Sequence, residues 1–156
     1  MNRTWMIACG LTALLVSTGS ASADPGHKAF TAGAPGDPKK PARTVEMTMK
    51  ETDDGKMLYE PNQIEVRRGE QVRFVLKNGG KVDHEFMLDS VANNAKHKVA
   101  MQKNPDMEHD DANGKRLAPE KNSEILWRFT KAGTFEFACL IPGHYESGMH
   151  GTVVVK

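Results

Sequence analysis

The sequence predicts an all-β fold, a sandwich of seven to eight short strands with one helical or loop insertion. The first observation is that apolar and polar residues alternate with a period of two in several short runs, as in half-buried strands. The second is that Gly, Asp and Asn separate these runs at short intervals, which indicates turns. The third is the length of 156 residues, which suits one domain after removal of a leader. Repeated short strands with intervening turns are typical of an antiparallel sandwich.

The first 23 residues have the features of a secretory signal peptide. Arg3 supplies a positive charge, an apolar run follows from Trp5 to about Val16, and the small residues at 21–23 fit a cleavage site. The apolar run is too short for a transmembrane helix. We therefore expect a periplasmic protein that is exported by a signal peptide and is not inserted in the membrane after the peptide is removed.

The predicted mature chain has two parts. Residues 24–42 are rich in Gly, Pro, Ala and Lys, and because Pro blocks regular strand pairing we expect a flexible leader there. Residues 43–156 form the predicted domain. Once Arg3 is removed, the chain has 20 basic and 20 acidic residues and shows no basic stripe. Nucleic acid is therefore not an expected partner.

Strand patterns follow one another along the domain. In each of them the apolar residues occupy alternate positions, so one face of the strand should be buried. The predicted strands are 44–50, 64–67, 72–77, 84–88, 125–129, 135–139 and 149–156. In the first strand Met47 and Met49 should face the core, and Trp127 should be a core aromatic residue.

The segment between 90 and 117 interrupts the alternation. Ser90 can cap a short helix that places Val91, Ala95 and Val99 on one face, and Pro105 ends it. A polar loop rich in turn residues follows. This segment is the predicted insertion.

Three metal-binding residue types lie close together in the loop before the last strand, which reads CLIPGHYESGM. Cys139, His144 and Met149 are separated by four residues each. A thiolate, an imidazole and a thioether suit copper best. Zinc is the alternative, but it more often uses a second Cys and rarely a thioether. Strand alternation places Cys139 and Met149 on inward faces, and a mature chain with a single Cys in an oxidising compartment leaves this thiol without a disulfide partner.

A trigonal copper site needs a second imidazole, which His84 can supply from the inward start of another strand. The alternative explains each residue alone, with Cys139 as a small buried hydrophobe and His84 as a hydrogen-bonded polar group. It does not explain why these residue types occur together. We therefore expect a metal site formed by His84 and the C-terminal loop.

A His close to Asn-Gly-Gly, followed far downstream by Cys-x4-His-x4-Met before the last strand, resembles the cupredoxins, the small blue-copper proteins. The loop lengths look most like those of rusticyanin and auracyanin, and residues 43–156 also look like periplasmic cupredoxins associated with bacterial copper tolerance. The resemblance implies a Greek-key β-sandwich or barrel and one type 1 copper. The ligands it implies are His84, Cys139, His144 and Met149.

The resemblance implies copper tolerance or copper handling with one-electron transfer chemistry. One alternative is a dedicated soluble electron carrier between redox partners, and another is an electron-entry module for a copper enzyme. We do not expect an enzyme, because the chain shows no second copper cluster or second domain. An unidentified redox protein is expected to dock near His144, on a patch formed by Leu140, Ile141, Pro142 and Tyr145.

The insertion offers a possible accessory copper site. Its soft or borderline ligands are His97, Met101, Met107 and His109. The alternative is a solvated excursion that its Met residues anchor to the sandwich. The spacing of these residues follows no strict rule, so both interpretations stay open from the sequence alone.

Overall fold

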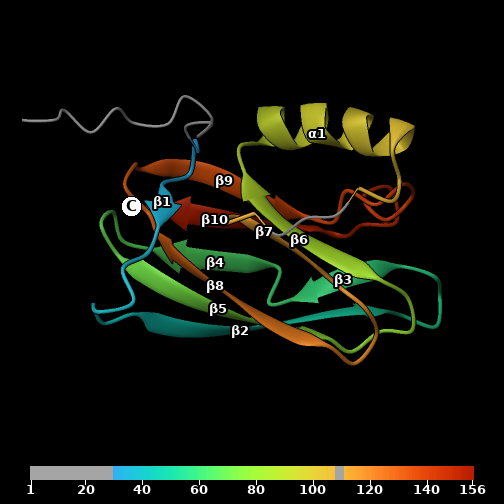
Figure 1. The fold of residues 1–156 in the computed structure, drawn as a ribbon, viewed down its shortest axis with the longest axis horizontal. Coiled ribbons are helices and arrows are strands. Elements are labelled where there is room, and N and C mark those ends of the chain that lie inside the picture. The colour runs from blue at the N-terminus through green and yellow to red at the C-terminus, as the bar shows by residue number, and fades with distance from the viewer. Residues whose placement is uncertain (1–29, 108–110) are drawn as a thin grey trace, which may run out of the picture.

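The computed structural model describes residues 30–107 and 111–156, which form two packed sheets and a helix (Figure 1). The elements are β1 (Ala34–Pro35), β2 (Arg43–Glu51), β3 (Met57–Glu60), β4 (Gln63–Val66), β5 (Gln71–Asn78), β6 (His84–Asp89), α1 (Val91–Lys103), β7 (Gly114–Leu117), β8 (Asn122–Arg128), β9 (Gly133–Ala138) and β10 (His150–Val155). The predicted signal peptide lies outside the described residues, as do His109 and residues 24–29 of the predicted leader.

The strand order is β1-β8-β5-β2-β3 in one sheet and β4-β10-β9-β6-β7 in the other. Each sheet ends in edge strands, so this part of the chain is a sandwich rather than a closed barrel. The prediction of an all-β sandwich with a helical insertion is confirmed.

The strand directions differ from the expectation in two places. β2 runs parallel to β5, and β10 runs parallel to β4. The other pairs, including β10 with β9 and β5 with β8, are antiparallel. The expected antiparallel arrangement thus holds for the strand pairs of the described residues other than these two. Alternation shows which face of a strand is buried, but it carries no information on the direction of the strand's neighbour.

The core lies between the two sheets and is filled from the inward positions of the strands. Met47, Met49 and Trp127 are fully buried there, as predicted. The rings of Phe86 and Phe137, from neighbouring strands β6 and β9, stack with centroids 5.4 Å apart. Such aromatic pairs each add roughly 1 kcal/mol to the stabilisation that their burial provides. The packed core fixes the strand ends that carry the candidate ligands.

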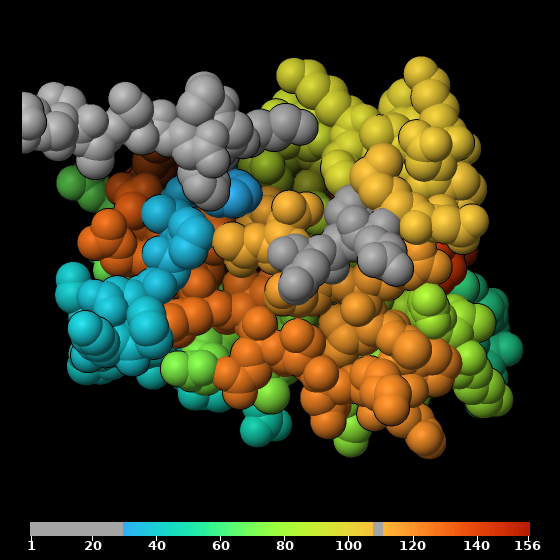
Figure 2. Space-filling model, in the orientation of Figure 1, coloured from blue at the N-terminus to red at the C-terminus, as the bar shows by residue number. Residues whose placement is uncertain are grey.

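Residues 30–42, the described part of the predicted leader, pack against the sandwich instead of forming a flexible arm. β1 pairs with Arg128 and Trp127 of β8. The ring of Phe30 meets Trp127 edge to face at 5.1 Å, and Ala32 is fully buried. Figure 2 shows this blue segment against the orange surface of the 114–128 region. Pro limits regular pairing, but hydrogen bonds between the Gln71 side chain and the backbone of Asp37 and Lys40 add to these contacts.

Helix α1 begins as predicted, because the Ser90 side chain accepts a hydrogen bond from the backbone of Asn93. The face that carries Val91 and Val99 is exposed, with 56% and 49% of these residues accessible. The helix instead buries Asn94 and Met101 against β6 and β9. Among the described residues, no helix is both long and apolar enough to cross a membrane.

Three strands were not predicted, and each is very short. β1 has two residues, and β3 and β7 have four each. The β7 sequence GKRL has almost no alternation, since its outer positions are Gly114 and Leu117 and its middle residues are charged. β7 is held by its pairing with β6 rather than by a pattern of its own.

Candidate metal centre

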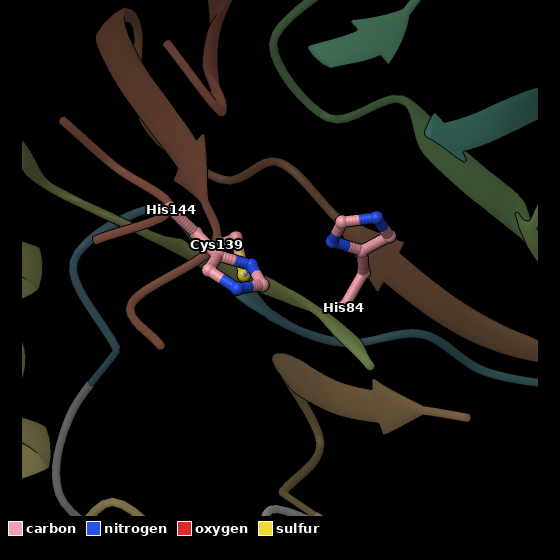
Figure 3. Close-up of side chains that lie close together, drawn as sticks. All are labelled: His84, Cys139 and His144. Atoms are coloured by element: carbon pink, nitrogen blue, oxygen red, sulfur yellow. Dashed lines mark hydrogen bonds between the residues drawn. The ribbon is translucent and has the colours of Figure 1, made fainter. Parts of the chain in front are cut away.

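Three candidate ligands meet at the end of the sandwich that lies opposite the C-terminus (Figure 1). One nitrogen of His84, one nitrogen of His144 and the sulfur of Cys139 all lie within 4.8 Å of one another. In Figure 3 the sulfur lies beside the His144 ring, and the His84 ring turns a nitrogen toward both. Residues that are 55 positions apart in the chain, His84 and Cys139, are thus neighbours in space.

Cys139 directly follows β9 and is fully buried. Its sulfur accepts a hydrogen bond from the backbone N–H of Glu85 at 3.3 Å and lies 3.3 Å from Nδ1 of His144. Burial raises the pKa of the Cys139 thiol to about 12. The thiol therefore keeps its proton at neutral pH until a cation takes its place.

The loop between Cys139 and Met149 is closed by its own backbone. The N–H of Cys139 donates to the carbonyl of Met149 at 3.0 Å, and the N–H of Met149 donates to the carbonyl of His144 at 3.1 Å. Gly143 and Gly148 have φ angles of 89° and 98°, which side-chain-bearing residues rarely adopt. These bonds and turns hold the three loop residues next to one another.

Met149 is fully buried and packs in the main core cluster together with Cys139. Its backbone contacts with Cys139 and His144 place it beside both. The inward direction predicted for Met149 is confirmed. A buried thioether at this position fits a weak fourth ligand of a copper site.

His84 is the first residue of β6 and is fully buried. Its Nε2 lies 3.0 Å from Oε1 of Glu51. The angle of this contact does not meet the geometry of a hydrogen bond from the ring. Among the described residues, neither ring nitrogen therefore has a hydrogen-bond partner. Burial lowers the pKa of His84, and the Glu51 carboxylate opposes this only in part. A neutral, buried imidazole without a directed partner on Nδ1 is suited to binding a cation.

His144 is less buried than His84. Its ring centroid lies 5.3 Å from that of His84. Burial lowers the pKa of His144, and the neighbouring His84 lowers it further. Both imidazoles are thus neutral at pH 7 and have a lone pair to offer.

Sequence reasoning missed Glu51. Burial raises the pKa of this carboxyl group, but hydrogen bonds from the backbone of Lys81 and Val82, together with His84, outweigh burial and lower the pKa overall. The sequence contained a signal for this role, because Glu51 follows the buried Met47 and Met49 at the same alternate positions of β2. A charged residue at an inward position of a strand end points to a specific partner.

Asn78 fixes the turn that leads into His84. Its side-chain amide donates to the carbonyls of Val82 and Leu117 at 2.8 and 2.9 Å, and its oxygen accepts from the N–H of Gly80 at 2.9 Å. Asn78 is fully buried. The Asn-Gly-Gly segment singled out in the sequence is therefore the support of the His84 side of the site.

The surface around His144 corresponds only in part to the predicted docking patch. Leu140 is fully buried and cannot belong to the patch. Pro142 is exposed, and Ile141 is partly buried. The phenol of Tyr145 donates to Oε1 of Glu136 at 2.9 Å, so one end of this side chain is anchored under α1. The accessible part of the predicted patch is Pro142 with the edges of its neighbours.

The Met residues of the insertion pack together. Met101 is fully buried in a small cluster with Met87, Ala138 and Leu140, and Met107 packs against that cluster. Both Met101 and Met107 thus take part in apolar packing. The accessory copper site stays a prediction, because one of its proposed ligands, His109, lies outside the described residues.

The donor set fits copper. It combines one thiol, two neutral imidazoles and one buried thioether, a combination typical of trigonal copper sites with a weak axial ligand. The described residues near the sulfur include no second thiol that a structural zinc site would use. The buried Nδ1 of His84, which has no hydrogen-bond partner among the described residues, is the observation that favours a bound cation.

Comparison with protein families and with curated proteins agrees with this donor set. The model of the plastocyanin/azurin family of copper-binding proteins matches residues 45–156. The "Copper-resistant cuproprotein CopI" of Rubrivivax gelatinosus is 46% identical over 94% of this chain and 93% of its own length. The protein of the same name from Pseudomonas aeruginosa is 37% identical over 88% of both chains.

Comparison with solved structures agrees with the fold. Auracyanin from Roseiflexus castenholzii matches 75% of this chain and 99% of its own, with a TM-score of 0.63 and 21% identity. Auracyanin B matches 81% of this chain and 98% of its own, with the same TM-score and 23% identity. A multicopper oxidase also matches, with a TM-score of 0.56, but over only 39% of its length.

Proposed function

The chain belongs to the plastocyanin/azurin family of copper-binding proteins, and from this premise we propose that it serves copper tolerance in the periplasm through one redox-active type 1 copper site. The proposed ligands are His84, Cys139, His144 and Met149. The observation that carries the proposal is the grouping of one buried thiol and two neutral imidazoles within 4.8 Å. Copper tolerance is supported by the two CopI relatives, which are described as copper-resistant cuproproteins.

Each ligand has a separate task in this proposal. The thiol of Cys139 gives up its proton on binding and supplies the strongest donor, and the Glu85 N–H holds the sulfur in place. The neutral rings of His84 and His144 offer lone pairs without first losing a proton. A bound copper ion supplies one-electron exchange between its cupric and cuprous forms.

The scaffold supports redox chemistry because it restricts movement of the ligands. His84 is the first residue of β6, and β6 is paired with β7 on one side and with β9 on the other. The ligand loop is closed by the hydrogen bonds between Cys139, His144 and Met149. A rigid site loses little free energy to rearrangement when the charge of the ion changes, which favours rapid electron exchange.

A dedicated electron carrier is the second candidate. It is favoured by the partial exposure of His144 beside the exposed Pro142, which gives electrons a short route to the surface. An electron-entry module for a copper enzyme is a third candidate, supported by the match to part of a multicopper oxidase. Neither alternative changes the proposed ligands, and each implies a protein partner near His144.

Growth on copper separates these functions. We propose deleting the gene and complementing it with the wild-type chain or with Cys139→Ser. Copper tolerance predicts that the deletion strain respires normally, fails on copper, and is rescued by the wild type but not by Cys139→Ser. A deletion strain that tolerates copper but loses respiration would contradict this function and favour the electron carrier.

A further inference from the structure

Glu51 ends β2 at an inward position and lies beside a candidate ligand. Its Oε1 is 3.0 Å from Nε2 of His84, and its side chain is 22% exposed whereas that of His84 is fully buried. The carboxylate thus approaches the side of the imidazole that faces away from the ligand group. A negative charge beside Nε2 favours a proton on that nitrogen, which leaves the lone pair of Nδ1 for the metal.

The loop before His84 is built around this carboxylate. The N–H of Lys81 donates to Oε2 at 2.9 Å, and the N–H of Val82 donates to Oε1 at 3.1 Å. Gly80 makes the close approach possible, because a Cβ atom on Gly80 would lie 2.6 Å from Oε2 of Glu51. The carboxylate is therefore held in place from the loop side before any ion binds.

A carboxylate placed against a ligand imidazole has two effects on the site. It favours a proton on Nε2 and thereby raises the donor strength of the nitrogen that faces the metal. It also places a negative charge one ring away from the bound ion, and this charge stabilises a doubly charged ion more than a singly charged one. Both effects favour cupric over cuprous copper.

We propose that Glu51 is a positioning residue that acts through His84 and biases the bound copper toward the cupric form. The inference rests on the proposed copper site and adds to it a residue that no ligand motif contains. For a protein of copper tolerance, this bias would favour the form of the metal that soft thiolates select less strongly.

Glu51→Gln separates the charge from the loop contacts. The Gln side chain keeps an oxygen that can accept from Lys81 and Val82, but it removes the negative charge beside His84. Glu46→Gln is the matched control. Glu46 is an exposed residue five positions earlier on the same strand, and its substitution by Gln changes the net charge by the same amount.

The experiment measures the dissociation constants of Cu(II) and Cu(I) by competition with chelators, and the reduction potential of the loaded protein. We expect Glu51→Gln to weaken Cu(II) binding at least tenfold, as is usual for residues that support metal ligands, with a much smaller effect on Cu(I). Each tenfold loss of Cu(II) affinity relative to Cu(I) affinity raises the one-electron potential by about 59 mV. Glu46→Gln should change neither affinity by more than about twofold, and the potential should change by no more than such a change in affinity implies.

Gly80→Ala is an independent variant that leaves the carboxylate in the chain and displaces it from His84. It should shift the affinity ratio in the same direction as Glu51→Gln, and it replaces that variant if the latter folds poorly. The proposal would be overturned if both variants lose Cu(II) and Cu(I) affinity equally, so that the ratio of the two affinities is unchanged. It would also be overturned if Glu46→Gln shifts this ratio as much as Glu51→Gln does. A wild-type chain that binds no copper would instead contradict the proposed function.

Discussion

The sulfur of Cys139 lies 3.3 Å from Nδ1 of His144, although four residues separate them on a tightly turned loop. The same loop returns the backbone of Met149 to hydrogen bonds with both residues. Three of the four proposed ligands are thus positioned by one short segment. Only His84 comes from elsewhere, and its strand is joined to β9 by direct pairing.

Met149→Leu tests the weak fourth ligand. The substitution keeps the volume of a fully buried side chain, so the free energy of unfolding should fall by less than about 1.5 kcal/mol. Copper should stay bound, and the reduction potential should rise, because loss of the axial donor favours the cuprous form. A redox titration and denaturant unfolding check this. Loss of copper, or a lower potential, would be incompatible with an axial role for Met149.

The two tyrosines should ionise only at unusually high pH. Burial raises the pKa of Tyr59 well above its ordinary value of 10.0, and burial together with Glu136 raises that of Tyr145 to about 12. In the unfolded chain both phenols lose their protons near pH 10, so folding stability should be lost as the pH rises above about 10. Phenolate absorbance of the copper-free protein, followed from pH 8 to 12, measures this. Appearance of two phenolates near pH 10 in the folded protein would contradict the described burial.

Gly33→Ala tests the attachment of the 30–42 segment. Gly33 has a φ angle of 147°, and a Cβ atom there would lie 2.1 Å from the carbonyl oxygen of Arg128. Because neither the backbone angle nor the space accepts a side chain, the free energy of unfolding should fall by more than about 1 kcal/mol. Denaturant unfolding and limited proteolysis within 30–42 are the measurements.

Gly79→Ala is the control for that substitution, because its Cβ would meet Thr48 Cγ2 at an ordinary 3.4 Å. If Gly33→Ala and Gly79→Ala have the same stability and the same cleavage pattern, the segment is not held as described.

Pro142→Glu tests the exposed surface beside His144. Under the proposed function electrons leave through this surface, so two copies would meet there in electron self-exchange, and a charge on each would oppose their approach. The self-exchange rate at low ionic strength should fall by roughly tenfold, as measured by NMR line broadening of mixtures of the two oxidation states. The visible spectrum should not change.

Pro142→Ala is the matched control, since it also removes the proline ring but adds no charge. Equal self-exchange rates for Pro142→Glu and Pro142→Ala would show that electrons leave by another surface.

The sequence was most informative where a pattern repeated. Alternation located the long strands and the inward positions of Met47, Met49 and Trp127, and the Ser90 cap located the start of α1. The spacing of Cys139, His144 and Met149 predicted a ligand loop, and the structure brings the Cys139 sulfur and a His144 nitrogen together there. Each of these features depends on residues close together in the chain, and such features can be read locally.

Other features depend on contacts between distant segments and were not predicted. The parallel pairing of β2 with β5 depends on how the chain crosses between sheets. The attachment of residues 30–42 depends on contacts with distant segments, among them the pairing with β8 and the aromatic contact with Trp127. Asn94 is buried on α1 because its amide donates to the carboxylate of Glu136, a partner 42 positions away. The contact between Glu51 and His84 likewise joins the ends of two strands.

Titration of the mature, copper-free chain with Cu(II), with metal counting and visible spectroscopy, tests the central claim most directly. We predict one tightly bound copper per chain and an intense visible absorption that comes from the bond between the Cys139 sulfur and copper. Cys139→Ser should remove this absorption while keeping the fold. A chain that stays colourless with Cu(II), or a coloured complex that persists in Cys139→Ser, would contradict the proposed site.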